Sequence, residues 1–139
     1  MDDIAQTLRD KGLRVTPQRV AIYRYLRGTR AHPMAEAIYA ELRPQYPGMS
    51  LNTVYKTLLA LEQVGLVQRF TTGENVFHYD ADTSPHVHAV CLRCGRVSDV
   101  PGDFTRELDE MRKRVAGKTD FKVMSNSHLV FGYCPECRA

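Results

Sequence analysis

Residues 86–95 read His86-Val-His88-Ala-Val-Cys91-Leu-Arg-Cys94-Gly95, and the same cysteine spacing returns near the end of the chain in Cys134-Pro-Glu-Cys137. Two thiolates separated by two residues can reach one ion from a tight turn, and two such pairs supply the four ligands of a tetrahedral zinc site. The glycine after the first pair lets the backbone curl back under the metal. We therefore predict a structural zinc that ties the start of the C-terminal half to its end. The alternatives are a redox-active dithiol and unpaired surface thiols.

The two histidines of this stretch predict a second metal site of different chemistry. On a strand, residues i and i+2 face the same side, so His86 and His88 can reach one ion. Two imidazoles are too few for a tight site, and the candidates for the other ligands are His32, Asp80 and Asp99. Imidazole and carboxylate without thiolate favour Fe(II) or Mn(II) over zinc. The alternative is a pair of surface histidines beside the zinc turn.

The overall composition is that of a soluble globular chain. It has 139 residues, of which 43% are hydrophobic and 25% charged, and this length suits one domain or two small ones. The acidic start has no apolar run behind it, and no segment approaches the roughly 18 apolar residues of a membrane span. We therefore expect a cytoplasmic protein without a membrane partner, in which cysteines bind metal rather than form disulfides.

Positive charge gathers near the N-terminus. Between Arg9 and Arg30 a single acidic residue, Asp10, accompanies seven basic ones, which are Arg9, Lys11, Arg14, Arg19, Arg24, Arg27 and Arg30. Such a cluster favours contact with phosphates. The alternative is a solvated helix face.

Residues 1–80 predict helices followed by a hairpin. A short helix containing Ile4 and Leu8 stops at Gly12, and Thr16 caps a second helix that begins at Pro17. Apolar residues share one face of the second helix and of a third that ends before Pro44, namely Val20, Tyr23 and Leu26, then Ala35, Ile38 and Leu42.

A fourth helix begins after the N-cap Ser50 and ends at Gly65. Its apolar positions Leu51, Val54, Leu58 and Leu61 leave Asn52, Tyr55, Lys56 and Gln63 outside. Residues 66–70 and 76–79 then predict two strands joined by a turn at 72–75. Helices followed by a hairpin make a winged helix-turn-helix.

The rest of the chain predicts a hinge and a smaller module. Residues 81–85 carry turn formers. Two short strands follow around the first cysteine turn, then a helix over 103–117 and one or two strands within 121–133. That helix places Phe104, Leu108, Met111 and Val115 on one face. We expect an α+β protein with a winged-helix domain at 1–80, a hinge at 81–85 and a small α/β domain at 86–139 that binds metal and dimerises.

Four motifs together resemble the ferric uptake regulator (Fur) superfamily. They are Gly12-Leu-Arg-Val-Thr-Pro-Gln-Arg19, His32-Pro, Ser50-Leu-Asn-Thr-Val-Tyr-Lys-Thr-Leu58 and the 86–95 stretch with its closing cysteine pair. The resemblance covers nearly the whole chain. It implies a homodimeric, metal-dependent transcriptional repressor that reads an AT-rich inverted repeat in double-stranded DNA. Met34 departs from the pattern, because the family commonly places a capping Ser, Thr or Asp there, and a lost cap costs about 1 kcal/mol.

The acidic positions indicate the branch. The zinc-uptake branch usually has a cysteine in place of Asp80, and the iron-uptake branch usually has glutamates in place of Asp80 and Asp99. The peroxide-responsive PerR branch has aspartate at both. The resemblance assigns the structural zinc to the four cysteines and the regulatory Fe(II) or Mn(II) to His32, Asp80, His86, His88 and Asp99. It also makes His32 and His86 the oxidation-sensitive residues.

The resemblance also suggests how DNA is bound. Tyr55 and Lys56 would reach base edges in the major groove, and Asn52 and Thr53 the backbone. Arg14 would enter a narrow minor groove, while Arg19 and Arg69 would contact phosphates. An iron- or manganese-uptake regulator remains the first alternative. A small metal-dependent enzyme and a zinc-containing interaction module are more remote, and we do not expect an enzyme. His78 is left outside the metal site, and His128 is a candidate for a secondary one.

Overall fold

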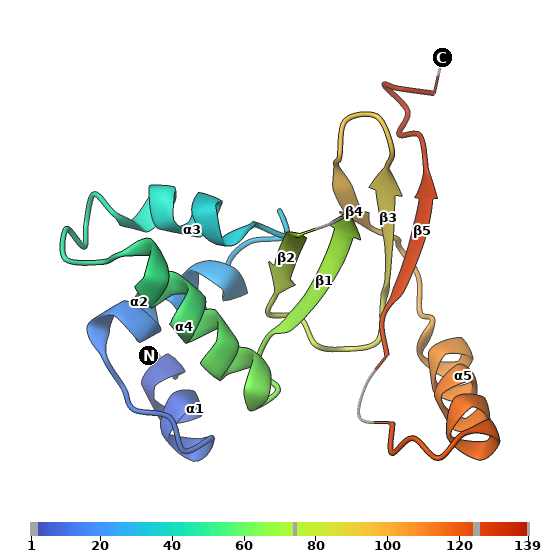
Figure 1. The fold of residues 1–139 in the computed structure, drawn as a ribbon, viewed down its shortest axis with the longest axis horizontal. Helices are drawn as coiled ribbons and strands as arrows, with labels where there is room; N and C mark the ends of the chain where they lie inside the picture. Colours follow the sequence, from blue (N-terminus) through green and yellow to red (C-terminus); the bar gives the residue numbers. More distant parts are fainter. Residues whose placement is uncertain (1–2, 74, 124–125, 139) are drawn as a thin grey trace. The chain divides into compact units, whose positions relative to one another are not determined.

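The computed structural model describes residues 3–73, 75–123 and 126–138. The chain forms two compact units, Met1–Thr83 and Ser84–Ala139. Each is described below by itself (Figure 1). Within the described residues, no helix combines the length and apolar character needed to cross a membrane.

The first unit is a winged helix. Its elements, in chain order, are α1 (Ile4–Asp10), α2 (Pro17–Arg27), α3 (Ala35–Leu42), α4 (Leu51–Gln63), β1 (Gln68–Gly73) and β2 (Val76–Asp80). The predicted caps are confirmed: the Thr16 hydroxyl accepts the Arg19 N–H, and the Ser50 hydroxyl accepts the Thr53 N–H. Gly12 and Gly65, which follow α1 and α4, adopt φ values of +77° and +80°. A side chain would be strained at either position.

The core of this unit lies between the helices. Val54, Leu58 and Leu61 of α4 are completely buried, together with Ile22 of α2 and Ile38 of α3. Each such side chain contributes about 1.5–3 kcal/mol through the apolar surface that it removes from water. Leu51, expected inside, is only partly buried because it lies in the first turn. The expected outer residues Asn52, Tyr55, Lys56 and Gln63 are exposed.

The wing is a two-stranded antiparallel hairpin whose turn is tighter than predicted. Strand β1 begins at Gln68 and continues through Thr72 and Gly73, which the sequence placed in the turn. The register shifts between Thr71 and Gly73, and this irregularity keeps the strand paired up to Val76. Asn75 adopts φ +58°, a conformation that asparagine tolerates well. Glu74, also placed in that turn, lies outside the described residues.

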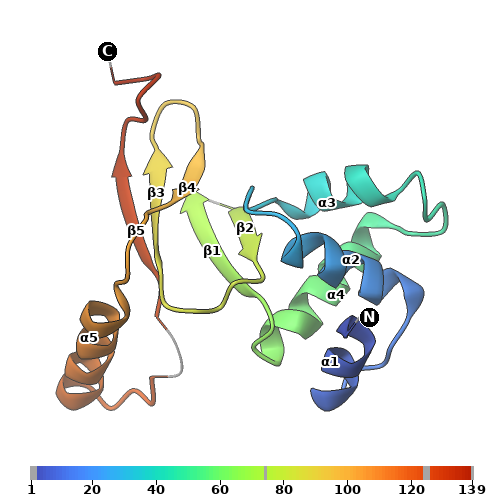
Figure 2. The ribbon, with the colours of Figure 1, turned by 180° about the vertical axis from the view of Figure 1, so that it is seen from behind.

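The described part of the second unit consists of a sheet and a helix (Figure 2). Its elements are β3 (Val87–Cys91), β4 (Val97–Asp99), α5 (Thr105–Lys118) and β5 (His128–Gly132), and the strand order is β4-β3-β5. β3 pairs antiparallel with β4 and parallel with β5. The connection through α5 allows the parallel pairing, which a short hairpin cannot provide. Within 121–133, the described residues form one strand, and residues 124–125 lie outside the description.

The apolar face predicted for α5 is only partly correct. Leu108 is buried, but Met111 and Val115 are 45% and 42% exposed, and Phe104 precedes the helix as a half-buried residue. On and after β5, Val130, Phe131 and Tyr133 are also more than half exposed. The prediction of an apolar face was correct, but within one copy of the chain these apolar side chains remain largely exposed.

Met34 allows the contribution of a missing cap to be measured. It occupies the N-cap position of α3 with extended backbone, and its side chain makes no capping hydrogen bond. Met34→Ser should therefore be more stable to urea than Met34→Ala by about 1 kcal/mol, because the hydroxyl can accept a first-turn N–H. Both variants lose the same packing, so equal unfolding midpoints would show that the start of α3 does not need a cap.

Candidate metal centres and nucleic-acid interface

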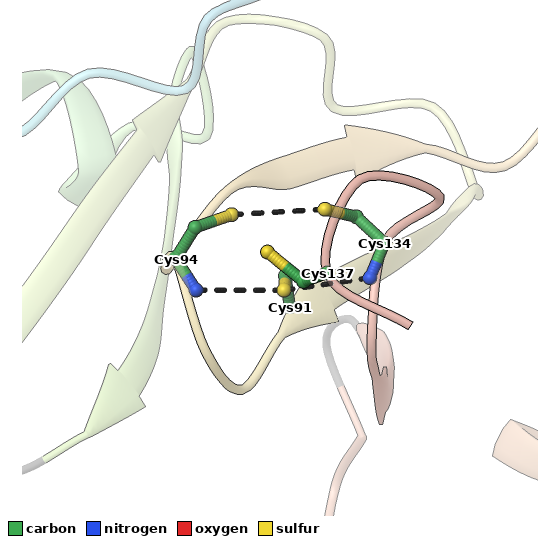
Figure 3. A group of neighbouring side chains, drawn as sticks. All are labelled: Cys91, Cys94, Cys134 and Cys137. Carbon is green, nitrogen blue, oxygen red and sulfur yellow. Dashed lines mark hydrogen bonds between the residues drawn. The ribbon is translucent and has the colours of Figure 1, made fainter. Parts of the chain in front are cut away.

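The four cysteines meet at one end of the second unit. Cys91 ends β3, Cys94 lies in the turn that follows, and Cys134 and Cys137 lie in the turn after β5. Their sulfurs lie within 4.8 Å of one another, and Figure 3 shows the four side chains converging. Because β3 and β5 are paired neighbours, with Cys91 opposite Gly132, the sheet itself brings the two turns together.

Backbone geometry prepares these thiols for metal. The N–H groups of Cys94 and Cys134 donate to the Cys91 sulfur at 3.5 and 3.4 Å, and they lower the pKa of Cys91 to about 6. The interaction with Cys134 raises the pKa of Cys137 to about 12. Four thiols this close cannot all lose their protons unless a cation compensates the charge.

The spacing of the sulfurs fits zinc. A tetrahedral ion with Zn–S bonds of about 2.3 Å places neighbouring sulfurs about 3.8 Å apart. The Cys94 and Cys134 sulfurs, one from each turn, are 3.8 Å apart. An ion pair between Arg96 and Glu136 at 3.0 Å also joins the two turns. Gly95, at φ +78°, donates its N–H to the Cys91 carbonyl and closes the first turn.

A second cluster of ligand-type side chains lies on β3 and β4. His88 and Asp99 are directly opposite in the antiparallel register, so their side chains share a face. The Nε2 atoms of His88 and His86 lie 3.4 and 3.5 Å from the same Asp99 oxygen. His86 donates from Nδ1 to the Ser84 carbonyl at 2.7 Å, which leaves Nε2 with the lone pair that a metal needs.

The first unit also contains a histidine and an aspartate that lie close together. His32, which lies just before α3, places Nε2 at 3.4 Å from an Asp80 oxygen at the end of β2, and both residues are buried. The other Asp80 oxygen accepts the Asp82 N–H at 2.9 Å and fixes the carboxylate. The sequence therefore identified side chains that pair within each unit: His32 with Asp80, and His86 and His88 with Asp99.

The distances within each group are compatible with ligands that share a divalent ion. Charge-assisted hydrogen bonds between imidazole and carboxylate are about 2.7–2.9 Å long, whereas the separations are 3.4–3.5 Å. A divalent ion with bonds of about 2.1 Å holds neighbouring ligand atoms roughly 3.0–3.4 Å apart. Nitrogen and carboxylate oxygen donors fit Fe(II) or Mn(II).

The residues expected to contact DNA lie on and around α4. Asn52, Tyr55 and Lys56 are exposed on the helix, and Arg14 and Arg69 are exposed on the loop before α2 and on β1. An open hollow of about 650 Å³ lies at the N-terminal ends of α2 and α4, and Thr16, Arg19, Thr53 and Lys56 are among its lining residues. Helix N-termini with basic side chains favour phosphate.

Two of these residues have acidic partners that the sequence did not reveal. The Tyr55 hydroxyl donates to Glu36 of α3 at 2.9 Å, and this hydrogen bond raises the pKa of Tyr55. The Arg69 guanidinium lies over the Phe77 ring and pairs with Glu62 at 3.2 Å. No spacing rule connects positions 36 and 55, because the contact depends on how α3 packs against α4.

The two remaining histidines differ. His78 is half-buried on β2 and donates from Nδ1 to the His32 carbonyl at 2.7 Å. His128 begins β5 opposite Val87. Among the described residues it joins neither group of ligand-type side chains, so a secondary metal site there gains no support.

Comparison with known proteins identifies the family. The Ferric uptake regulator family matches residues 10–131, which is most of the chain. This chain is a member of that family. Family members are metal-dependent transcriptional regulators that bind DNA, and the chain is therefore a regulator rather than an enzyme.

Three individual proteins show where the similarity is strong. The Peroxide operon regulator of Bacillus subtilis is 40% identical over 139 residues, covering 99% of this chain and 92% of that protein. The Peroxide-responsive repressor PerR of Staphylococcus epidermidis is 35% identical, covering 99% and 90%. The crystal structure of the Campylobacter jejuni peroxide stress regulator is 31% identical with a TM-score of 0.72, covering 99% and 100%.

The cysteine geometry predicts that zinc holds the second unit together. Cys94→Ser should bind substoichiometric zinc, measured by elemental analysis, and should unfold at least ~10 °C lower than the unchanged protein. Cys94 is exposed, so loss of packing cannot account for such a drop. An unchanged melting temperature together with lost zinc would contradict a structural role for the ion.

Proposed function

We propose that this regulator is a peroxide-responsive repressor with a structural zinc and a regulatory Fe(II) or Mn(II). The zinc is bound by Cys91, Cys94, Cys134 and Cys137. The regulatory ion is bound by His32, Asp80, His86, His88 and Asp99. The observation that carries the regulatory ion is the pair of aspartates, Asp80 and Asp99, each lying 3.4–3.5 Å from imidazole nitrogens. The similarity to two peroxide regulators supports peroxide as the signal.

The linkage between metal and DNA follows from where the ligands lie in the chain. His32 and Asp80 belong to the winged helix, and the other three belong to the second unit. An ion that takes ligands from both restricts the orientations that the connecting segment at 81–85 allows. DNA requires a defined placement of the two recognition helices of a dimer. Metal and operator therefore each strengthen binding of the other by the same coupling free energy.

The recognition surface is α4 with its flanking basic residues. The α4 helix enters the major groove, with Tyr55 and Lys56 at base edges and Asn52 and Thr53 at the backbone. Glu36 engages the Tyr55 hydroxyl, so the ring presents its apolar edge, which suits thymine methyl groups. Arg19 and Arg69 neutralise phosphates, and Arg14 suits the narrow minor groove of an AT-rich operator.

The dimer explains the apolar surface of the second unit. Val130, Phe131 and Tyr133 are exposed along one segment of the chain, and an edge strand such as β5 pairs readily with another strand. A two-fold interface at β5 would cover this surface and give the symmetry that an inverted repeat demands. The operator is therefore expected to be an AT-rich inverted repeat.

Peroxide sensing depends on which side chains surround the metal. Bound Fe(II) would activate hydrogen peroxide. The expected targets are the imidazoles of His32 and His86: one peroxide oxygen is inserted into a ring C–H bond and the other leaves as water, so the ring supplies the two electrons that reduce peroxide. An oxidised ring is a poorer ligand, so one modified histidine lowers the affinity of the site for the ion. Repression then ends because the restriction at 81–85 is released.

An uptake regulator that responds to metal supply uses the same ligand types. The geometry of Asp80 and Asp99 does not show whether the signal is peroxide or metal supply. Oxidation of a histidine by peroxide would distinguish the two. A protein-interaction module leaves unexplained the basic residues that line the hollow beside α4.

Removing one proposed ligand should uncouple metal from DNA. With a duplex selected from random sequence by the Mn(II)-loaded protein, Mn(II) should raise affinity about 5- to 150-fold. His86→Ala should lose that gain in a gel-shift titration, whereas His128→Ala, which removes a histidine outside both clusters, should keep it. Equal Mn(II) responses of the two variants would refute the assigned ligands.

Peroxide should mark the site chemically when iron is bound. After treatment of the Fe(II)-loaded protein with a small excess of hydrogen peroxide, peptide mass spectrometry should find one added oxygen on His32 or His86. The Mn(II)-loaded protein treated in the same way is the control and should stay unmodified. Release of DNA without an oxidised histidine would rule out histidine oxidation as the mechanism.

A further inference from the structure

The metal-ligand candidate His32 has an unfavourable backbone conformation. Its φ is +52°, in the left-handed region that residues with a Cβ rarely adopt. The residue is nonetheless buried, and it places Nε2 at 3.4 Å from Asp80. A strained residue persists only where its surroundings hold it, so the contacts around His32 have a function to explain.

The wing strand β2 supplies those contacts. His78 donates from Nδ1 to the His32 carbonyl at 2.7 Å, and the Tyr79 N–H donates to the Pro33 carbonyl at 3.0 Å. The following residue, Met34, offers no side-chain cap to α3. Hydrogen bonds from the wing therefore fix the segment before α3, where a cap would otherwise help.

The His78 ring is itself held in place. It stacks on Phe70 of β1 with ring centroids 5.6 Å apart and planes 14° from parallel, and the edge of the His32 ring contacts the same phenylalanine at 5.8 Å. A carbonyl oxygen can only accept, so His78 carries its proton on Nδ1. Its Nε2 forms a hydrogen bond with the Thr72 hydroxyl at 3.2 Å.

We propose that His78 is the positioning residue of the regulatory metal site. It holds His32 in the left-handed conformation that turns Nε2 toward Asp80, and it connects this ligand to Thr72 near the tip of the wing. With both ring nitrogens engaged by protein atoms, His78 acts through His32 rather than on the ion. This inference rests on the assignment of His32 as a ligand under Proposed function.

Because His78 links Thr72 of the wing to His32, the wing can change the affinity of the site for metal. Arg69, which is expected to contact phosphate, lies on β1 next to Phe70, and Tyr79 is its partner across the hairpin. When DNA orders this hairpin, Thr72 and His78 are held more firmly, and His32 with them. Part of the coupling between operator and metal therefore passes through a hydrogen-bonded chain within the winged helix.

Five variants of the zinc-loaded, full-length chain separate this role from simple packing. His78→Phe keeps a ring to stack on Phe70 and removes both hydrogen bonds. His78→Asn places an amide N–H near the position of Nδ1, whereas His78→Gln places it near Nε2. His32→Ala removes the proposed ligand, and His128→Phe is the matched control for adding a phenylalanine.

The measurement is Mn(II) affinity without DNA, by calorimetry or by the electron paramagnetic resonance of free Mn(II). His78→Phe should bind Mn(II) at least ~10-fold more weakly, and His78→Asn should recover most of that loss while His78→Gln does not. In metal-free protein, the Tyr79 amide should exchange with solvent faster in His78→Phe than in His78→Asn. The His128→Phe variant should match the unchanged protein in both measurements.

The ligand assignment of His32 and the positioning role of His78 are contradicted by different results. If His32→Ala leaves Mn(II) affinity unchanged, the ligand assignment fails. If His32→Ala weakens binding but a folded His78→Phe does not, the positioning role of His78 is overturned and the assigned function stands. Should His78→Phe not fold, equal Mn(II) affinities of His78→Asn and His78→Gln would overturn it instead.

Discussion

The regulatory chemistry depends on imidazole and carboxylate groups that face one another at a spacing suited to ligands of one divalent ion. His32 and Asp80 lie 3.4 Å apart in the winged helix, and Asp99 lies 3.4–3.5 Å from two histidines in the second unit. Because strands and loops hold these nitrogen and oxygen atoms close together, an ion can bind them with little rearrangement of the protein.

The two metal centres differ because their donors differ. Four thiols at the ends of β3 and β5 form a site in which every ligand comes from one compact unit, and a permanent ion suits it. The nitrogen and oxygen donors bind a divalent ion less tightly and leave it open to exchange and redox chemistry. The sheet register brings residues of both groups together, since β3 carries a proposed ligand of each kind at positions 88 and 91.

Sequence reasoning succeeded where the governing interactions are local. Thr16 and Ser50 predicted helix starts because a cap depends on a residue and its own first turn, and the cysteine pairs predicted their cluster because two-residue spacing is a turn geometry. It failed where distant packing decides. The Glu36–Tyr55 and His78–His32 hydrogen bonds join residues 19 and 46 positions apart. The exposed Met111 and Val115 show a different limit, because an apolar pattern does not say which copy of the chain covers it.

Acidic partners of residues expected to contact DNA, and of Arg27 in the basic N-terminal cluster, bear on binding to DNA of arbitrary sequence. Arg69 is paired with Glu62, Arg27 with Asp3, and the Tyr55 hydroxyl with Glu36. Carboxylates beside the cations reduce the number of counterions that contact with arbitrary DNA releases, and counterion release supplies most of sequence-independent affinity. Affinity for unrelated sequence is therefore expected to be lower than the basic residues alone suggest. Weaker sequence-independent binding favours discrimination between the operator and other DNA.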